Sequence, residues 1–197
     1  SSHAVFNPEK LDWFNGQHIN RLTAEAIAVH LEERLRTQDW WTDEFLGSRR
    51  EWLRRVIELL KPRSRTLSDF VDRIPIFLAE SVEYDPLAVE KHLKVPHLGA
   101  HVRALRLALE QSPGFRAEEL ERVLREVAES LGVKAGILIH ATRVGLTGQA
   151  VSPGLFEVME LIGPERTLRR LATLERFLSG AAEPAMEQTV ERTDPKL

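Results

Sequence analysis

The apolar residues of this chain recur every three or four positions, and this period limits the fold more than any other feature of the sequence. Between residues 117 and 131 the apolar stripe of one helical face consists of Leu120, Val123, Leu124, Val127 and Leu131. Similar stripes predict helices over 24–37, 48–60, 98–111 and 164–178. No run of four to eight residues alternates strictly between apolar and polar side chains, which is the pattern of a half-buried strand. The sequence therefore predicts an all-α fold.

Prolines and capping residues interrupt this helical pattern often, and they predict an array of about ten short helices rather than a long bundle. Pro62 is expected to end the helix before it, because proline disfavours the helical conformation of the preceding residue. Thr66 and Asp69 have the spacing of a capping box, which starts a new helix. Gly148 is expected to close a helix over 134–146, since glycine adopts the left-handed cap conformation without strain.

The chain is expected to contain two helical subdomains, because the break at Asp85 and Pro86 is the clearest boundary within it. The first subdomain is 1–85, which carries a basic cluster, and the second is 86–178. The remaining segment, 179–197, has few apolar residues and is expected to be a mobile tail.

Composition excludes several classes of protein. The 197 residues include no cysteine, which excludes disulfides, a thiolate zinc site and a cysteine nucleophile. No run of about 18 apolar residues and no secretory signal occurs, so a cytoplasmic protein without membrane contacts is expected. The net charge of −3 is unlike that of a generic nucleic-acid-binding protein, which is strongly basic. Any nucleic-acid site must therefore be local.

The sequence offers no constellation of catalytic or metal-binding residues. His97 and His101 are four positions apart on one helical face, but no acidic residue on the adjacent turn completes a zinc site. The carboxylates are interleaved with arginines on helix surfaces, as expected of solvated faces. No glycine-rich phosphate loop follows a strand. We therefore predict no catalytic residue, no metal ligand and no cofactor in this chain.

The strongest local charge lies between residues 45 and 65, where seven basic and two acidic residues give a net charge of +5. The basic residues are Arg49, Arg50, Arg54, Arg55, Lys61, Arg63 and Arg65. Such a cluster attracts a phosphate backbone in a salt-dependent way. It is equally typical of a helix with arginine-rich flanks in solvent, and charge alone favours neither interpretation.

A second informative segment joins two predicted helices. Ser152 and Pro153 are expected to be the N-cap and first turn of the second helix, whose free amides would face solvent or a ligand. Arg143 would extend toward the same space, and Leu155 and Phe156 would offer a surface for an unstacked RNA base. The alternative is an ordinary helix–helix corner with Leu155 and Phe156 in the core, which the pattern alone favours.

Four segments resemble, in order, the region of bacterial glutamyl-tRNA synthetases that follows their catalytic half. They are 5–16 (VFNPEKLDWFNG), 59–63 (LLKPR), 142–148 (TRVGLTG) and 152–157 (SPGLFE), followed by Leu161, Ile162, Gly163 and Arg166. The resemblance extends from about residue 6 to residue 178, and the last two segments together are the most specific.

This resemblance implies the all-helical anticodon-binding region of a class I aminoacyl-tRNA synthetase, with tRNA-Glu as its RNA partner. Arg63 corresponds to the arginine that reads the last anticodon base, and Arg143 to an arginine that contacts the anticodon. The loop and helix start that cradle the first bases correspond to Ser152, Pro153, Leu155 and Phe156. The tRNA backbone would be bound by the remaining basic residues, Arg49, Arg50, Arg54, Arg55, Lys61 and Arg65.

The resemblance also implies a parent enzyme whose catalytic half attaches glutamate to tRNA with ATP and Mg²⁺. The His-x-Gly-His and Lys-Met-Ser-Lys motifs of that half do not occur in this sequence, so the chain is expected to be a non-catalytic part of the enzyme. Its oligomeric state has no signal in the sequence, and a monomer is expected. It departs from the family at Thr142 and Gly145, where proline and alanine are common, and at His140, where the family tends to be uncharged. The alternative, from another class, is a helical module whose basic face binds an acidic protein.

Overall fold

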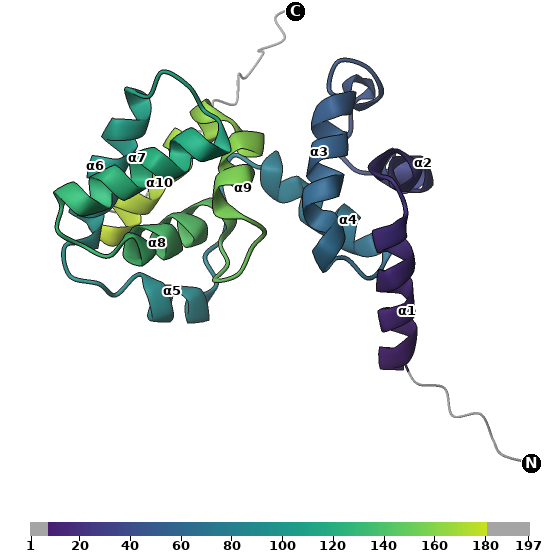
Figure 1. Ribbon diagram of the computed structural model, residues 1–197, viewed down its shortest axis with the longest axis horizontal. Coiled ribbons are helices and arrows are strands. Elements are labelled where there is room, and N and C mark those ends of the chain that lie inside the picture. The colour runs from purple at the N-terminus through teal and green to yellow at the C-terminus, as the bar shows by residue number, and fades with distance from the viewer. Residues whose placement is uncertain (1–7, 181–197) are drawn as a thin grey trace, which may run out of the picture.

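The computed structural model describes residues 8–180, and this part of the chain consists of helices and loops without a strand (Figure 1). Its ten α-helices are α1 (Pro8–Arg21), α2 (Ala24–Leu35), α3 (Arg50–Leu60), α4 (Leu67–Arg73), α5 (Pro86–His92), α6 (Leu98–Glu110), α7 (Ala117–Ser130), α8 (Ala135–Thr147), α9 (Leu155–Ile162) and α10 (Pro164–Leu178). Three short 3₁₀ helices lie among them: η1 (Asp43–Leu46), η2 (Lys61–Arg63) and η3 (Ile74–Phe77). The predicted all-α fold is confirmed. Most of the expected tail, 179–197, and the beginning of segment 5–16 lie outside the described residues.

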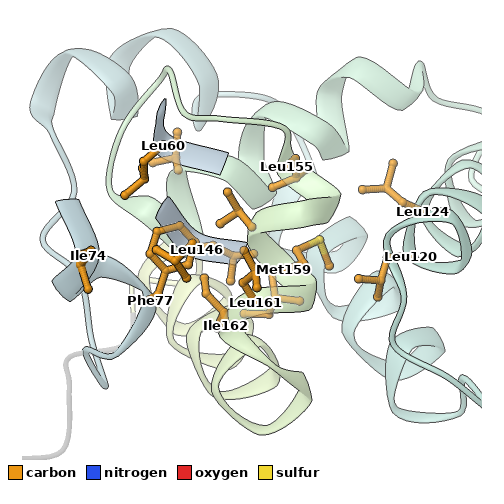
Figure 2. Packing of buried hydrophobic residues seen from close by; sticks show 14 of the residues in the cluster. Leu60, Ile74, Phe77, Leu120, Leu124, Leu146, Leu155, Met159, Leu161 and Ile162 are labelled. Carbon is orange, nitrogen blue, oxygen red and sulfur yellow. The ribbon is translucent and has the colours of Figure 1, made fainter. Parts of the chain in front are cut away.

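The helices form two groups that meet at α9 (Figure 1). The first group contains α1 to α4 and the 3₁₀ helices, and the second contains α5 to α10. Helix α9 contacts α3 and η3 of the first group and α7, α8 and α10 of the second. Figure 2 shows Met159 of α9 between Phe77 of η3 and Leu120 of α7, and each of these side chains is at most 1% exposed. A continuous hydrophobic core therefore extends through both groups.

Two polar side chains of α3 add to the contact between the groups. Nε1 of Trp52 donates a hydrogen bond to the carbonyl oxygen of Leu161 at 2.8 Å. Nη2 of Arg55 donates to Oε1 of Glu160 at 2.7 Å, so both interactions join α3 to α9. They fix the orientation of α3 because each has a defined donor and acceptor, which apolar packing lacks.

A buried arginine holds three segments together at the same junction. Arg170 of α10 is 2% exposed. Its guanidinium donates to the carbonyl oxygens of Leu146 at 2.5 Å and Ile76 at 2.7 Å, and also to that of Ala79. Burial lowers the pKa of Arg170 to about 10. Because a buried carbonyl without a donor costs about 1–3 kcal/mol, Arg170 stabilises the end of α8 against η3.

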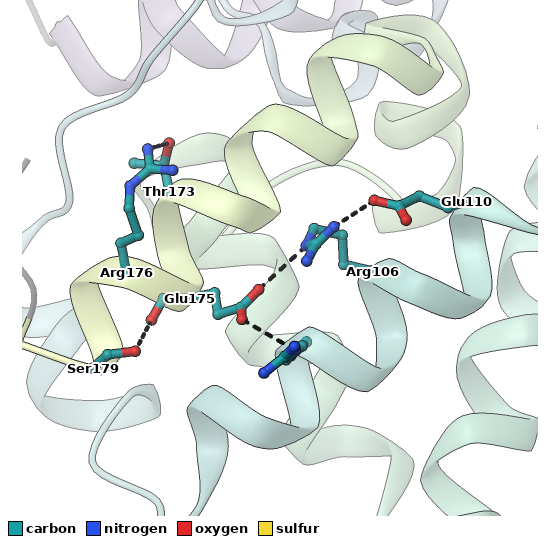
Figure 3. Close-up of polar contacts among 7 residues, drawn as sticks. Arg106, Glu110, Thr173, Glu175, Arg176 and Ser179 are labelled. Carbon is teal, nitrogen blue, oxygen red and sulfur yellow. Dashed lines mark hydrogen bonds and ion pairs between the residues drawn. The ribbon is translucent and has the colours of Figure 1, made fainter. Parts of the chain in front are cut away.

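Within the second group, α10 packs along α6 (Figure 3). Nε of Arg106 in α6 lies 3.2 Å from Oε2 of Glu175 in α10, and Arg106 also pairs with Glu110. Helix α8 approaches α10 closely at Gly145, where an added Cβ would lie 2.6 Å from Cδ2 of Leu174. Gly145 therefore allows the backbone of α8 to lie against a leucine of α10.

The helix boundaries agree with the sequence prediction to within one or two residues for the five strongest stripes. The capping box is present: the amide of Asp69 donates to Oγ1 of Thr66, and the amide of Thr66 donates to Oδ2 of Asp69. Gly148 ends α8 with a φ of +73°, as predicted for a left-handed cap. Local sequence thus sets where these helices begin and end.

Candidate nucleic-acid interface

A pocket of about 400 Å³ lies where the two groups of helices meet. Its walls come from η2, α4 and η3 of the first group and from the end of α8, the following loop and α9 of the second. Its polar residues are Arg63, Asp72, Arg73, Thr147, Gln149 and Ser152, and apolar side chains and Pro153 form the rest. The pocket therefore brings together three of the predicted anticodon-binding residues, Arg63, Ser152 and Pro153. Its volume is in the range of ligand-binding pockets.

Arg63 lies on the first wall of this pocket, in η2. Its backbone is fixed, because Nη1 of Arg73 donates to the carbonyl oxygen of Arg63 at 2.6 Å. The side chain of Arg63 is exposed, and within residues 8–180 it forms no ion pair. A fixed backbone and uncommitted guanidinium donors make Arg63 available to a ligand in the pocket.

Arg143 lies beside the pocket in α8 and is half-buried. Its Nε donates to Oγ of Ser152 at 3.1 Å, which connects it to the loop that lines the pocket after α8. Burial lowers the pKa of Arg143 from its usual value, and the positive charge of Arg63 lowers it further. The two predicted anticodon-reading arginines are thus close enough to repel each other. This arrangement favours a ligand that accepts hydrogen bonds from both guanidinium groups.

The prediction that Ser152 caps the following helix is wrong. Helix α9 begins at Leu155, and Gly154 is its N-cap. The hydroxyl of Ser152 is engaged within the loop instead, since it accepts from Arg143 and donates to the carbonyl oxygen of Pro153 at 2.8 Å. Arg143 thus takes the hydroxyl that a capped helix amide would use. It lies nine positions before Ser152, so the serine–proline pattern carries no sign of this contact.

The N-terminus of α9 is not a free anion-binding site. The carboxylate of Glu157 lies so close to Gly154 that an added Cβ there would be 2.2 Å from its Oε2. A carboxylate at a helix N-terminus interacts favourably with the helix dipole and occupies the place that a phosphate would take. The site therefore favours the neutral edge of a base over a phosphate.

Leu155 and Phe156 differ in what they can offer to a ligand. The side chain of Leu155 is 3% exposed and fills the core, as the alternative interpretation of this corner expected. It provides no stacking surface, because its side chain already packs against the protein. Phe156 is half-buried and packs on the same core, which leaves part of its ring accessible.

Four of the predicted backbone-binding residues are engaged within the protein. Three of them form ion pairs: Arg54 with Glu51 at 2.6 Å, Arg55 with Glu160 at 2.7 Å and Lys61 with Glu58 at 2.8 Å. The guanidinium carbon of Arg49 lies 4.6 Å from the ring centroid of Phe45 and 4.5 Å from that of Trp52, which is a cation–π contact. Burial lowers the pKa of Arg49.

Arg50 and Arg65 are exposed and form no ion pair within residues 8–180. Arg50 begins α3, whereas Arg65 lies beyond its other end, between η2 and α4, and α3 is about 16 Å long for its 11 residues. Arg65 borders a second, smaller hollow together with Arg63 and Trp13, whereas Arg50 borders a hollow between α2 and α3. The structure therefore does not bring the six predicted residues into one site.

Three polar residues of the pocket carry no signal in the sequence pattern: Asp72, Arg73 and Gln149. Asp72 and Arg73 end α4, and Gln149 follows the glycine cap of α8. None of them belongs to a motif, and only the contact between the two groups of helices places them around one cavity.

Two other kinds of site find no support in the geometry of the described residues. Among residues 8–180, no three His, Asp or Glu side chains are grouped as metal ligands would be, and His97 and His101 lie just before α6 and in its first turn. No helix in this same range is both long and apolar enough to cross a bilayer.

The fold and the pocket agree with a known family. Residues 19–174 match the family model described as the anticodon binding domain, and the chain belongs to this family.

Its relatives identify the kind of enzyme in which such a domain is found. The chain is 40% identical over 172 residues to glutamate–tRNA ligase 2 of Koribacter versatilis, which covers 86% of this chain and 35% of that protein. It is 35% identical over 181 residues to the glutamate–tRNA ligase of Syntrophobacter fumaroxidans, and the match covers 92% of this chain and 37% of that protein. A crystal structure of a glutamate tRNA ligase from Elizabethkingia meningosepticum superposes with a TM-score of 0.78 at 25% identity. The match covers 90% of this chain and 34% of that one. The chain thus spans about a third of the length of these relatives, and the predicted resemblance is confirmed.

Proposed function

We propose that this chain recognises the anticodon of tRNA-Glu as part of a glutamate–tRNA ligase. The observation that carries this proposal is the shared pocket: Arg63 from one group of helices and Ser152 from the other line one cavity, with Arg143 hydrogen-bonded to Ser152 beside it. Membership of the anticodon binding domain family and similarity to glutamate–tRNA ligases support it.

The chemistry of the pocket suits splayed pyrimidines. Pyrimidine bases present O2 and N3 or O4 acceptors, which match the guanidinium donors of Arg63 and Arg143. Asp72 adds a carboxylate acceptor to the same cavity, and an acidic side chain is the usual partner of the cytosine amino group. A wall that contains both donors and an acceptor can distinguish cytosine from uracil.

The parent enzyme, a cytoplasmic monomer in this proposal, would supply the catalytic half that uses ATP and Mg²⁺ to attach glutamate to the tRNA. No residue of this chain is assigned to that chemistry. Its role is to select the tRNA, so that binding energy at the anticodon distinguishes the cognate RNA from others.

The test is the affinity of the 197-residue chain for a tRNA-Glu transcript and for the same transcript with a changed anticodon. A mismatched anticodon base should weaken binding by about 1–3 kcal/mol, so the cognate transcript should bind about 5- to 150-fold more tightly. Equal affinities at several salt concentrations would overturn the proposal. Association with an acidic protein that survives nuclease treatment would support the protein-binding alternative instead.

The backbone contacts require a separate test, since phosphate binding carries no sequence information. Arg50→Ala and Arg65→Ala are expected to weaken both transcripts alike and to reduce the slope of affinity against salt. Arg54→Ala is the matched control, because Arg54 is already paired with Glu51. An equal decrease in affinity for the transcripts in all three variants would show that an arginine paired within the protein binds RNA as well as an unpaired one.

A further inference from the structure

Two histidines are stacked on each other beside Arg143, and one of them contacts its guanidinium. The rings of His92 in α5 and His140 in α8 have centroids 4.5 Å apart, and their planes are inclined by 13°. Nδ1 of His140 lies 3.2 Å from Nη1 of Arg143. Arginine has donors and no acceptor, so Nδ1 must be the acceptor in this contact. The ring of His140 is therefore neutral in this arrangement, with its proton on Nε2.

The other side of the same guanidinium is held by the loop after α8. Nε of Arg143 donates to Oγ of Ser152 at 3.1 Å, and this hydroxyl donates in turn to the carbonyl oxygen of Pro153 at 2.8 Å. Arg143 is thus fixed at two points that belong to different elements. Its third nitrogen, Nη2, donates to no group in the described part of the chain, so this end of the guanidinium is available to a base.

We propose that neutral His140 positions Arg143 for base recognition, and that His92 holds the ring of His140 by stacking on it. This inference rests on the function proposed above for the pocket. An arginine side chain is flexible, and fixing it before the RNA arrives reduces the entropy cost of binding. His140 acts through Arg143 and need not touch the RNA.

The charges around His140 make this arrangement sensitive to pH. His140 faces His92 and Lys91 from α5 and Arg143 from its own helix, and Arg63 of η2 lies close enough to act on Arg143. Burial, and then the neighbouring positive charges, lower the pKa of both histidines, which keeps the acceptor form at neutral pH. Protonation of His140 would turn its acceptor into a donor and place a cation beside Arg143, so acid should release the arginine.

Two variants of His140 separate the hydrogen bond from the stack. His140→Phe keeps an aromatic ring on His92 but has no acceptor, and it is expected to weaken cognate tRNA binding by about 3- to 10-fold. His140→Asn keeps an acceptor near the position of Nδ1 and should remain within about 2-fold of the original chain. His30→Phe, at an exposed position of α2, is the matched control and should change nothing.

The ratio of affinities for the cognate and changed-anticodon transcripts gives the pH readout. General attraction to phosphate increases as histidines become charged, but this effect is common to both transcripts and cancels in the ratio. The ratio should fall when the pH is lowered from about 7.5 to about 5.5, the range in which histidine titrates. In His140→Asn, which does not titrate, it should depend much less on pH.

A double-mutant cycle and NMR distinguish failure of this inference from failure of the proposed function. In an Arg143→Ala background, His140→Phe should have no further effect, because a positioning residue has nothing left to position. The ¹⁵N shifts of the His140 ring at neutral pH should show a proton on Nε2 alone.

The positioning role would be overturned if His140→Phe still decreased the affinity in the Arg143→Ala background. It would also be overturned if His140→Phe alone left the affinity unchanged, or if the NMR shifts showed a proton on Nδ1. If the chain shows no preference for the cognate anticodon, the proposed function itself fails and the role in base recognition fails with it, whereas the NMR result still reports whether the hydrogen bond with Arg143 exists.

Discussion

At the scale of single residues, three arginines of the same chain have three different surroundings, and these determine what each can do. Arg63 is exposed and its side chain forms no ion pair in the described residues. Arg143 is half-buried and hydrogen-bonded to Ser152, yet Nη2 stays open. Arg170 is 2% exposed and donates to backbone carbonyls. Only Arg63 and Arg143 of these three can therefore meet a ligand.

Removal of the Arg143 side chain should affect anticodon recognition selectively. Arg143→Ala removes donors beside the pocket, so cognate binding is expected to weaken by about 1–3 kcal/mol while binding of a changed-anticodon transcript changes little. Titration of both transcripts measures the two values. Arg122→Ala, on the exposed face of α7 where Arg122 pairs with Glu126, is the control and should leave both unchanged.

The histidine stack predicts how stability depends on pH. In the folded chain the pKa of His92 and of His140 lies below the ordinary 6.5, first because of burial. As the pH falls below this value, the unfolded chain takes up protons that the folded chain does not, so the free energy of unfolding decreases. Above the ordinary histidine pKa, the two histidines make their full contribution to the free energy of unfolding.

Urea unfolding at about pH 7.5 and about pH 5.5, on either side of the ordinary histidine pKa, measures this effect. His140→Asn should show a smaller decrease than the original chain, because one of the two shifted groups no longer titrates. Identical decreases in the two proteins would contradict the prediction. Carboxylates with lowered pKa values, such as Glu160 and Asp69, titrate in a more acidic range and do not confound the comparison.

At the scale of elements, the turn after α8 sets the shape of the pocket. Gly148 adopts a φ of +73°, and its carbonyl oxygen accepts from the amide of Asp85 at 2.8 Å. A Cβ at this position would lie 2.0 Å from the carbonyl oxygen of Glu83. The turn therefore requires glycine for two reasons, its conformation and its contact with the loop before α5.

A matched pair of glycines separates these two reasons. Gly132→Ala, at the end of α7, should cost about 1–2 kcal/mol, because its φ is +67° but an added Cβ would meet no atom within 4 Å. Gly148→Ala carries the same conformational cost and also a clash with backbone, so its cost should be clearly larger. Chemical denaturation measures the loss of unfolding free energy in both variants. Equal losses would show that the loop before α5 moves to accommodate the added Cβ without a measurable cost.

The sequence predicted the elements well but not how they are joined around the pocket. Helical stripes, the Thr66 capping box and the Gly148 cap are local signals, and the structure contains all of them. The N-cap at Ser152 was predicted wrongly because Arg143 competes for the same hydroxyl. Gly145, a departure from the family, has its reason in Leu174 of another helix. These contacts join residues that the local pattern does not relate.

At the scale of the whole molecule, the pocket exists only because two groups of helices are held together. Arg63 and Asp72 belong to the first group, and Ser152 and Gln149 to the second. Their sequence separation explains why Asp72 and Gln149 could not be predicted as site residues. Discrimination between bases should therefore depend on the junction, whereas attraction to phosphate, which arises from single exposed arginines, should not.

Weakening the junction tests this dependence. Arg170→Met fills a similar volume but leaves the carbonyls of Leu146 and Ile76 without their donor, so it is expected to destabilise the chain by about 2–4 kcal/mol. Because these carbonyls belong to the two groups of helices that meet at the pocket, the preference for the cognate anticodon should fall by about 0.5–2 kcal/mol while binding of a changed-anticodon transcript is kept. Arg106→Met is the control, since it removes the ion pair with Glu175 inside the second group (Figure 3), and neither residue lines the pocket. It should lower stability without lowering that preference, and an equal decrease of preference in both variants would mean that overall stability, not the junction, controls recognition.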